Sequence, residues 1–225
     1  MNILVLDCAV TKISIGVETE NKFISHTYDI GMRQSEILVP VIDEILSKAG
    51  ISASDLNYSA LTIGPGSFTG LRLGISALKA IELAYNVPVY GISSLKVYSY
   101  AYENFNIPVL SCIDANKDKF YASLTENKTC LLEEGDWEVN QIADKLKGLS
   151  KVLVTGPDAQ KLASQIKEIH KDIDILLPQV SSMTTESLLA ITKDKIANGQ
   201  PALKDFDGPV YLRASEAELA LKNKE

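Results

Sequence analysis

Residues 1–30 carry short runs of aliphatic and β-branched side chains separated by polar turns. This pattern predicts three strands, at 2–6, 14–19 and 22–28. From 34 to 48 the apolar residues recur three and four positions apart, which predicts a helix that stops at Gly50. Pro40 lies inside this helix, so we expect it to kink the helix or to mark its first turns.

Strands and helices alternate through the rest of the chain. We expect further strands at 59–63, 87–90, 107–113, 120–125, 151–155 and 173–177. We expect further helices at 67–85, 94–103, 138–147, 157–169 and 185–198. Alternation of this kind is typical of α/β architecture, so the sequence predicts an α/β fold in both halves.

The two halves of the chain repeat one pattern. Residues 5–22 align with residues 111–128, so that Asp7 matches Asp114 and the run Thr-Glu-Asn-Lys occurs at 19 and again at 125. A four-residue identity can arise by chance, but both copies lie in the same succession of strand, Asp turn, strand and turn. We therefore predict duplicated subdomains, 1–104 and 105–225, with a crossing back of the last helix as an open alternative.

Charge and hydropathy narrow the function classes. The chain has 22 Lys and Arg against 29 Asp and Glu, a net charge of −7, which repels phosphate backbones. The longest apolar runs, such as Ile3–Leu6, are far below the roughly 20 residues that span a bilayer. The first residues also lack the pattern of a secretory signal. We expect a cytoplasmic protein without membrane contact.

Cysteine and histidine positions predict no metal site. Cys8, Cys112 and Cys130 are widely spaced and form no C-x-x-C pair, so we expect free structural thiols. His26 and His170 are too far apart in the chain to suggest a zinc site of their own. No Ser-His-Asp or Cys-His pattern at meaningful spacing is present, which argues against a peptidase.

The segment Gly64–Gly74, with the sequence GPGSFTGLRLG, leads from a strand into a helix. Backbone N–H groups at such a helix start can bind an anion. However, the segment matches neither the P-loop pattern nor a Rossmann G-x-G-x-x-G. The glycine-loop residues that this reading singles out are Gly64, Gly66, Ser67, Thr69 and Arg72.

The same helix also carries a seam of small and apolar residues: Gly70, Gly74, Ala77, Ile81 and Ala84 recur at spacings of three and four. Small side chains along a seam let another helix approach closely. Because this helix is apolar nearly all round, it needs burial on several sides. Its own domain and the helix at 34–48 supply two sides. We expect a partner subunit on the third, with burial by this chain alone as the alternative.

Several segments together resemble the TsaB (YeaZ) family. The resemblance covers essentially the whole chain, and the glycine-rich segment is its most specific part. It implies an α/β, two-lobed actin-like (ASKHA) fold with duplicated mixed-sheet subdomains. The matching segments are Asp7–Thr11, Gln34–Pro40, Gly64–Gly74, Gly91–Leu95, Ile113–Ala115 with Tyr121, and Tyr211–Arg213.

The resemblance implies a non-catalytic subunit of the machinery that forms threonylcarbamoyladenosine next to the anticodon of ANN-decoding tRNAs. The implied partners are a TsaD paralogue, which carries the chemistry, the TsaE ATPase, and a second copy of the chain when it is alone. The tRNA is reached only through the complex. ATP and Mg²⁺ are used by the complex, and we expect no cofactor or metal bound tightly by this chain alone.

The resemblance also assigns residues. It implies that the partner binds the helices at 34–48 and 67–85. Relatives often carry a histidine at or beside position 34, where this chain has glutamine. The predicted partner-binding residues are Gln34, Ile37, Leu38, Val41, Ile42, Ile45, Gly70, Leu71, Gly74, Ala77, Leu78 and Ile81.

Asp7, Thr11 and Asp114 occupy turns that position Mg-nucleotide in active actin-like enzymes. The turn after Asp7 lacks the usual glycine, so the resemblance and the residues both favour degenerate nucleotide turns in which the carboxylates cap the chain locally. The alternative function is a stand-alone actin-like small-molecule kinase or ATPase, motivated by the two aspartates and the glycine loop.

Overall fold

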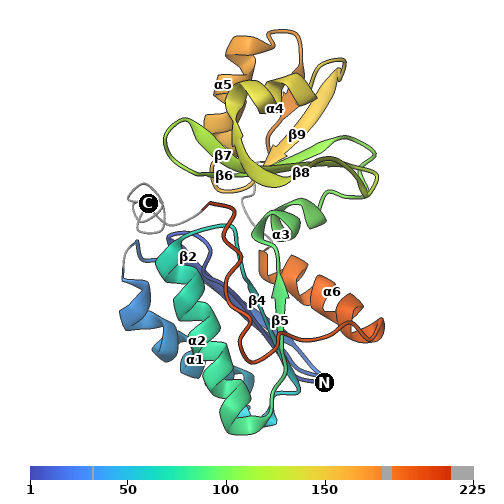
Figure 1. The fold of residues 1–225 in the computed structure, drawn as a ribbon. Coiled ribbons are helices and arrows are strands. Elements are labelled where there is room, and N and C mark those ends of the chain that lie inside the picture. Colours follow the sequence, from blue (N-terminus) through green and yellow to red (C-terminus); the bar gives the residue numbers. More distant parts are fainter. Residues whose placement is uncertain (32, 179–183, 214–225) are drawn as a thin grey trace.

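The computed structural model describes residues 1–31, 33–178 and 184–213, which form two lobes, each built around one five-stranded sheet (Figure 1). In the first lobe the strand order is β3-β2-β1-β4-β5. Strand β2 is antiparallel to β1 and β3, whereas β1, β4 and β5 are parallel. The strands are β1 (Ile3–Asp7), β2 (Lys12–Glu18), β3 (Phe23–Asp29), β4 (Tyr58–Thr62) and β5 (Val89–Ile92).

The second sheet repeats this topology, with the order β10-β9-β6-β7-β8. Here too the second strand is antiparallel to its neighbours, and β6, β9 and β10 are parallel. The strands are β6 (Val109–Asp114), β7 (Lys119–Glu126), β8 (Thr129–Glu138), β9 (Lys151–Thr155) and β10 (Asp174–Leu176).

Helices follow the strands in the same places in both halves. The first half contains α1 (Gln34–Ala49), α2 (Phe68–Tyr85), α3 (Ser94–Tyr100) and the short η1 (Ala53–Asp55), and the second half contains α4 (Val139–Lys145), α5 (Ala159–Ile169) and α6 (Thr184–Ala197). Gly50 ends α1 in the left-handed conformation, with φ of 75°. Ser67 caps α2, because its hydroxyl accepts a hydrogen bond from the Gly70 N–H.

The internal repeat is visible at the turns after the central strands. The N–H of Ala9 donates to the Asp7 carboxylate (3.0 Å), and the N–H of Asn116 donates to the Asp114 carboxylate (2.9 Å). Each aspartate thus caps the turn that follows its strand. The α/β fold with duplicated mixed sheets is therefore confirmed in local detail as well as in topology.

The edge strand β8 has no counterpart among the predicted elements. Its sequence TCLLEEGDWE is largely polar, and only Leu132 is buried among its residues. Its pairing with β7 is also irregular between Ala122 and Thr125. A polar, irregular edge strand lacks the alternation on which strand prediction depends. The helix predicted at 94–103 is shorter than expected, because α3 ends at Tyr100.

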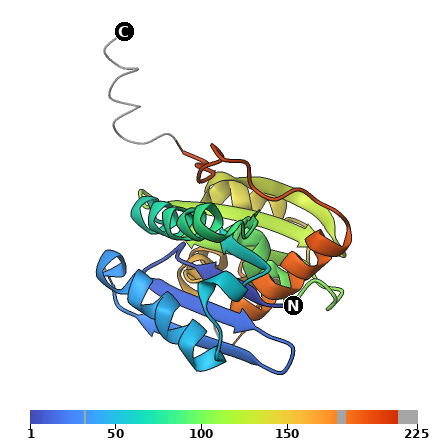
Figure 2. The same ribbon diagram turned by 90° about the horizontal axis from the view of Figure 1, so that it is seen from below.

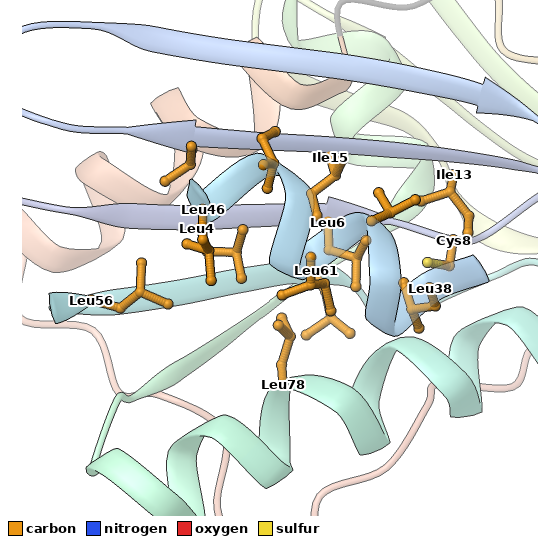
Figure 3. Packing of buried hydrophobic residues seen from close by; sticks show 14 of the residues in the cluster. Leu4, Leu6, Cys8, Ile13, Ile15, Leu38, Leu46, Leu56, Leu61 and Leu78 are labelled. Atoms are coloured by element: carbon orange, nitrogen blue, oxygen red, sulfur yellow. The ribbon is translucent and has the colours of Figure 1, made fainter. Parts of the chain in front are cut away.

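Two layers cover the first sheet. On one face, α1 and α2 lie side by side over leucines and isoleucines of β1, β2 and β4; Figure 3 shows Leu4, Leu6 and Ile15 of the strands in the same buried cluster as Leu38 and Leu78 of the helices. On the other face lies α6, from the C-terminal part of the chain (Figures 1 and 2). None of the helices in the described residues is both long and apolar enough to cross a membrane.

Helix α6 packs with the first sheet rather than with the second. Its residues Leu188, Leu189 and Ile191 share one buried cluster with Ile3 and Val5 of β1. The boundary at 104 therefore follows the sequence repeat, whereas the packing of α6 crosses it. Burial of the sheet face opposite α1 and α2 therefore depends on a helix that comes late in the chain.

Candidate functional site

The helices α1 and α2 carry the residues that the sequence assigns to a partner, and most of these side chains point into the protein. Gln34, Leu38, Val41, Ile42 and Ile45 of α1 are buried, as are Gly70, Leu71, Gly74 and Leu78 of α2. Ile37, Ala77 and Ile81 are half-buried against the same core. The buried residues pack on this chain's own sheet, and their direct contact with a partner stays a prediction.

The glycine seam of α2 faces the chain itself. A Cβ atom on Gly70 would lie 2.2 Å from the Cys8 carbonyl oxygen and 2.7 Å from the Gln34 side-chain oxygen. A Cβ on Gly74 would lie 3.3 Å from a methyl group of Leu61. The small residues therefore let α2 approach the end of β1 closely. At Gly70 and Gly74 the seam is therefore occupied by this chain itself, whereas Ala84 at its other end is exposed, and contact of the seam with a partner helix stays a prediction.

Gln34 has an internal role at the start of α1. Its side-chain amide donates to the carbonyl oxygens of Val10 (2.5 Å) and Lys12 (3.4 Å). These carbonyls belong to the turn between β1 and β2, so Gln34 fixes that turn from the helix. Glutamine therefore supplies the hydrogen-bond donor at this position.

The solvent side of α1 and α2 carries a different set of residues, which we call the outer face: Glu36, Val39, Pro40, Asp43, Thr69, Arg72, Ser76, Ala80 and Leu83. All of them are exposed. Val39 is 66% and Leu83 is 87% exposed, although both are aliphatic. Between Arg72 and Leu83 the outward positions of α2 are small. The sequence does contain a signal for the exposure of these two side chains, because Val39 and Leu83 fall outside the inward-facing apolar stripe of their helices.

Arg72 lies at the first turn of α2 in an aromatic cluster. Its guanidinium carbon is 3.5 Å from the centre of the Phe68 ring, and its Nε donates to the Tyr211 hydroxyl (2.9 Å). The rings of Phe68 and Tyr211 stack with their centres 5.0 Å apart. Arg72, which the sequence singles out as a glycine-loop residue, therefore binds the C-terminal part of its own chain.

The glycine loop contacts the turn after β1 instead of forming an anion cradle. The N–H of Ser67 donates to the Ala9 carbonyl (2.6 Å), and a Cβ on Gly66 would lie 2.3 Å from that same oxygen. The N–H of Gly70 is taken by the Ser67 hydroxyl (3.2 Å). A carbonyl oxygen thus occupies the place where a phosphate would need donors, which argues against the anion-binding reading.

A cavity of about 330 Å³ lies between the two lobes. Asp7 and Thr11 line it from the first lobe, and Gly156 and Asp158 line it from the second. The ring of Tyr98 in α3 also lines it, and the hydroxyl of Tyr98 is buried without a hydrogen-bond partner in the part of the chain that the structure describes. The structure therefore brings Asp7 and Thr11 together at one interlobe site.

Asp114 is not among the residues that line this cavity, and it is already paired. Its carboxylate binds the Lys161 ammonium group at 2.5 Å, and its backbone N–H donates to the Asp158 carboxylate (2.7 Å). Burial acts to raise the pKa of Asp114, but Lys161 and the N–H of Asn116 outweigh it, so the pKa is lowered. Asp158 is the carboxylate of the second lobe that lines the cavity.

The Asp7 carboxylate is buried among neutral groups. The donors bound to it are the backbone N–H of Ala9 (3.0 Å) and the hydroxyl of Thr62 (2.8 Å). Burial raises the pKa of Asp7, and these two hydrogen bonds reduce that rise without cancelling it. Among the described residues no group of three or more His, Cys, Asp or Glu side chains could hold a metal ion. The charged lining residues of the cavity are Asp7, Asp158 and Lys12, and the Lys12 ammonium group lies 3.6 Å from the Asp29 carboxylate, so little unpaired positive charge faces the cavity where a nucleotide phosphate would need it.

Asp7 makes stability depend on pH. The pKa of the Asp7 carboxyl is raised in the folded protein. Asp7 therefore stays protonated in the folded protein at pH values at which it is ionised in the unfolded chain, where its pKa is about 3.9. Stability therefore falls as the pH rises from about 4 through the folded pKa. The variant Asp7→Asn keeps an oxygen acceptor and has no proton to lose. In urea unfolding, its stability relative to wild type should increase from pH 4 to pH 7; parallel pH profiles would contradict this.

Most of the chain matches a known protein family. Residues 31–200, more than half of the chain, match the family described as TsaD, tRNA N6-adenosine threonylcarbamoyltransferase. The chain belongs to this family. Within it, the similarity to TsaB proteins runs through the full length. The tRNA threonylcarbamoyladenosine biosynthesis protein TsaB of Escherichia coli (strain K12) is 27% identical over 240 residues, covering 100% of both chains.

Two further relatives agree with this placement in the family. TsaB of Bacillus subtilis (strain 168) is 26% identical over 226 residues, covering 97% of this chain and 96% of its own length. Among solved structures, YeaZ from Pseudomonas aeruginosa superposes with a TM-score of 0.75 at 22% identity, covering 94% of this chain and 99% of that chain. The resemblance to TsaB (YeaZ) and the two-lobed α/β fold with duplicated mixed sheets expected from the sequence are thereby confirmed.

Proposed function

We propose that this chain is a non-catalytic subunit of tRNA threonylcarbamoyladenosine biosynthesis that binds a TsaD-type enzyme through the outer face of α1 and α2. The full-length similarity to proteins named for this biosynthesis supports the pathway. The exposed aliphatic side chains of Val39 and Leu83 support the docking role and are the observation on which it rests. The proposed place of action is the cytoplasm.

The shape of the outer face suits a partner helix. Thr69, Ser76 and Ala80 point to solvent along α2 and are small, so a second helix can approach the α2 backbone there. Val39 and Leu83 flank this strip and would supply apolar contact area at its edges. Because the same face can bind its own copy, the free protein is expected to form a homodimer that the TsaD-type partner displaces.

The interlobe cavity supports an accessory rather than a catalytic role. Asp7 and Asp114, the aspartates at the corresponding turns of the two halves, are hydrogen-bonded within the chain, and the charge of Asp114 is neutralised by Lys161. Chemistry, ATP and Mg²⁺ are therefore assigned to the assembled complex, in which a TsaE ATPase joins through the TsaD-type subunit. The net charge of −7 favours contact with tRNA through the partners only.

Co-purification tests the proposal. The chain should form a stable complex with the TsaD-type enzyme of the same organism, eluting from size exclusion as one species distinct from the homodimer. Adding the TsaE-type ATPase should shift this species again. Two separate peaks at micromolar concentrations of both proteins would contradict the docking role.

Nucleotide titration tests the alternative of a stand-alone actin-like kinase or ATPase, for which the interlobe cavity is the favouring observation. With Asp7 bound to neutral donors and Asp114 paired with Lys161, we expect no turnover of Mg-ATP by the isolated chain and no saturable binding below about 1 mM, equivalent to about 4 kcal/mol. Isothermal calorimetry and phosphate release measure both. Turnover that is lost in Asp7→Asn would establish the alternative.

A further inference from the structure

The last described residues of the chain, 203–213, run along the first lobe and end on the second. In Figure 1 this segment, coloured red, passes beside α2 and β5 toward the second lobe. We call it the C-terminal strap. The N–H of Leu203 donates to the Val89 carbonyl, and the N–H of Val210 donates to the Ile63 carbonyl, both at 2.7 Å. The Lys79 ammonium group of α2 binds the Leu203 and Lys204 carbonyl oxygens at 3.2 and 2.9 Å.

Two glycines in the first lobe make room for the strap. A Cβ on Gly64 would lie 2.3 Å from the Val210 carbonyl oxygen, and Gly64 has a φ of 125° that L side chains rarely adopt. A Cβ on Gly91 would lie 2.8 Å from the Leu203 side chain. The glycine loop and strand β5 are therefore shaped around this segment.

The far end of the strap binds the second lobe through Arg213. Its guanidinium group donates two hydrogen bonds to the Asp136 carboxylate of β8, at 2.7 and 2.8 Å, and a third to the Ala115 carbonyl oxygen at 2.8 Å. Both charged side chains are largely shielded, at 26% and 17% exposure. A planar, bidentate contact of this kind has a fixed geometry that a point charge cannot reproduce.

Between these two ends, the strap contacts the first turn of α2. Tyr211 accepts the hydrogen bond from Arg72 and stacks on Phe68. Only Leu212 separates Tyr211 from Arg213, so the position of the aromatic ring follows the position of the guanidinium group. The three consecutive residues Tyr211, Leu212 and Arg213 thus link the second lobe to the first turn of α2 in the first lobe.

We propose that Arg213 is a positioning residue: by binding Asp136 and the Ala115 carbonyl, it seats the C-terminal strap and thereby orders the first turn of α2. A change in the distance between the lobes is transmitted to the Phe68–Arg72–Tyr211 cluster at the edge of the outer face. The inference goes beyond the proposed function and does not depend on it, since it concerns the isolated chain.

Hydrogen–deuterium exchange on the isolated protein tests this inference. In Arg213→Ala, exchange should become at least 10-fold faster in the strap, read at the Val210 amide, and in residues 64–72, read at the Leu71 amide. Amides of the central strand β1 should be unchanged. The matched control is Lys193→Ala, which removes another partly buried ion pair, with Glu18, that does not involve the strap.

A second pair of variants separates positioning from a general loss of stability. Asp136→Asn removes the charge that Arg213 binds and should accelerate the same two regions. In the double variant Arg213→Ala/Asp136→Asn the effect should be no larger than in Arg213→Ala alone, because both changes break one contact. Arg213→Lys should recover only part of the protection.

Three results would overturn the inference: unchanged exchange at Val210 in Arg213→Ala, faster exchange in the strap without any change in residues 64–72, or additive effects of the two substitutions. The first result would contradict the role of Arg213 in holding the strap in place. The second would contradict the coupling of the strap to α2. The third would contradict a single shared contact between Arg213 and Asp136. Failure to bind a TsaD-type partner would contradict the proposed function and leave these exchange results standing.

Discussion

Replacing Gly70 by alanine should destabilise the protein by about 3 kcal/mol, whereas the same replacement at Gly74 should be close to neutral. Both residues lie in α2, and both gain about 1 kcal/mol of helix propensity on substitution. They differ in what the new methyl group meets. At Gly70 it would lie 2.2 Å from the backbone oxygen of Cys8, which cannot move without displacing the turn after β1.

At Gly74 the nearest atom is a methyl group of Leu61 at 3.3 Å, and a leucine side chain can shift by a few tenths of an ångström. Thermal unfolding measures the difference. For a chain of this size about 3 kcal/mol corresponds to a decrease in Tm of roughly 10 °C. Equal Tm values for the two alanine variants would contradict the close approach of α2 to β1.

Two substitutions on the outer face, Ala80→Arg and Leu83→Glu, should each weaken binding of the TsaD-type partner at least 100-fold, about 2.7 kcal/mol. Arginine at position 80 fills the strip of small residues along α2, and glutamate at position 83 places a charge where the proposed interface is apolar. Because both positions are exposed, the free energy of unfolding should change by no more than about 0.5 kcal/mol.

The matched control for this experiment is Ile169→Glu. Ile169 is also an exposed aliphatic residue of a helix, 45% accessible, but it ends α5 in the second lobe. Calorimetric titration of each variant with the partner gives the affinities. Wild-type affinity in both α2 variants would place the partner elsewhere, and an equal loss in Ile169→Glu would show that the effect is not specific to the outer face.

The sequence predicted the fold well because its signals were local. The Asp turns, the glycine that ends α1 and the serine that begins α2 each depend on neighbouring residues, and each is present in the structure. The edge strand β8 was missed because its exposed, polar residues show no alternation. The packing of α6 on the first sheet is a long-range property that no local pattern specifies.

The sequence predicted partner-binding residues on α1 and α2, and the structure shows that most of these residues face this chain's own core. Periodicity shows that α2 has an apolar seam, yet a seam of small residues suits close approach to a sheet as well as to a partner helix. Only the structure shows that Gly70 faces Cys8 while Ala80 and Leu83 face solvent. The roles of Tyr211 and Arg213 depend on contacts more than 70 positions away in the chain, such as the one between Arg213 and Asp136, and these have no signature in the local sequence.

The late position of α6 has a consequence during synthesis on the ribosome. When residues 1–100 have emerged, the strands of the first lobe can pair and α1 and α2 can cover one face, but Ile3, Val5 and Ala60 on the opposite face await Leu188 and Ile191. Nearly the whole second half must be translated before that face is covered. A nascent first lobe therefore leaves these aliphatic side chains without their α6 partners until α6 has been synthesised.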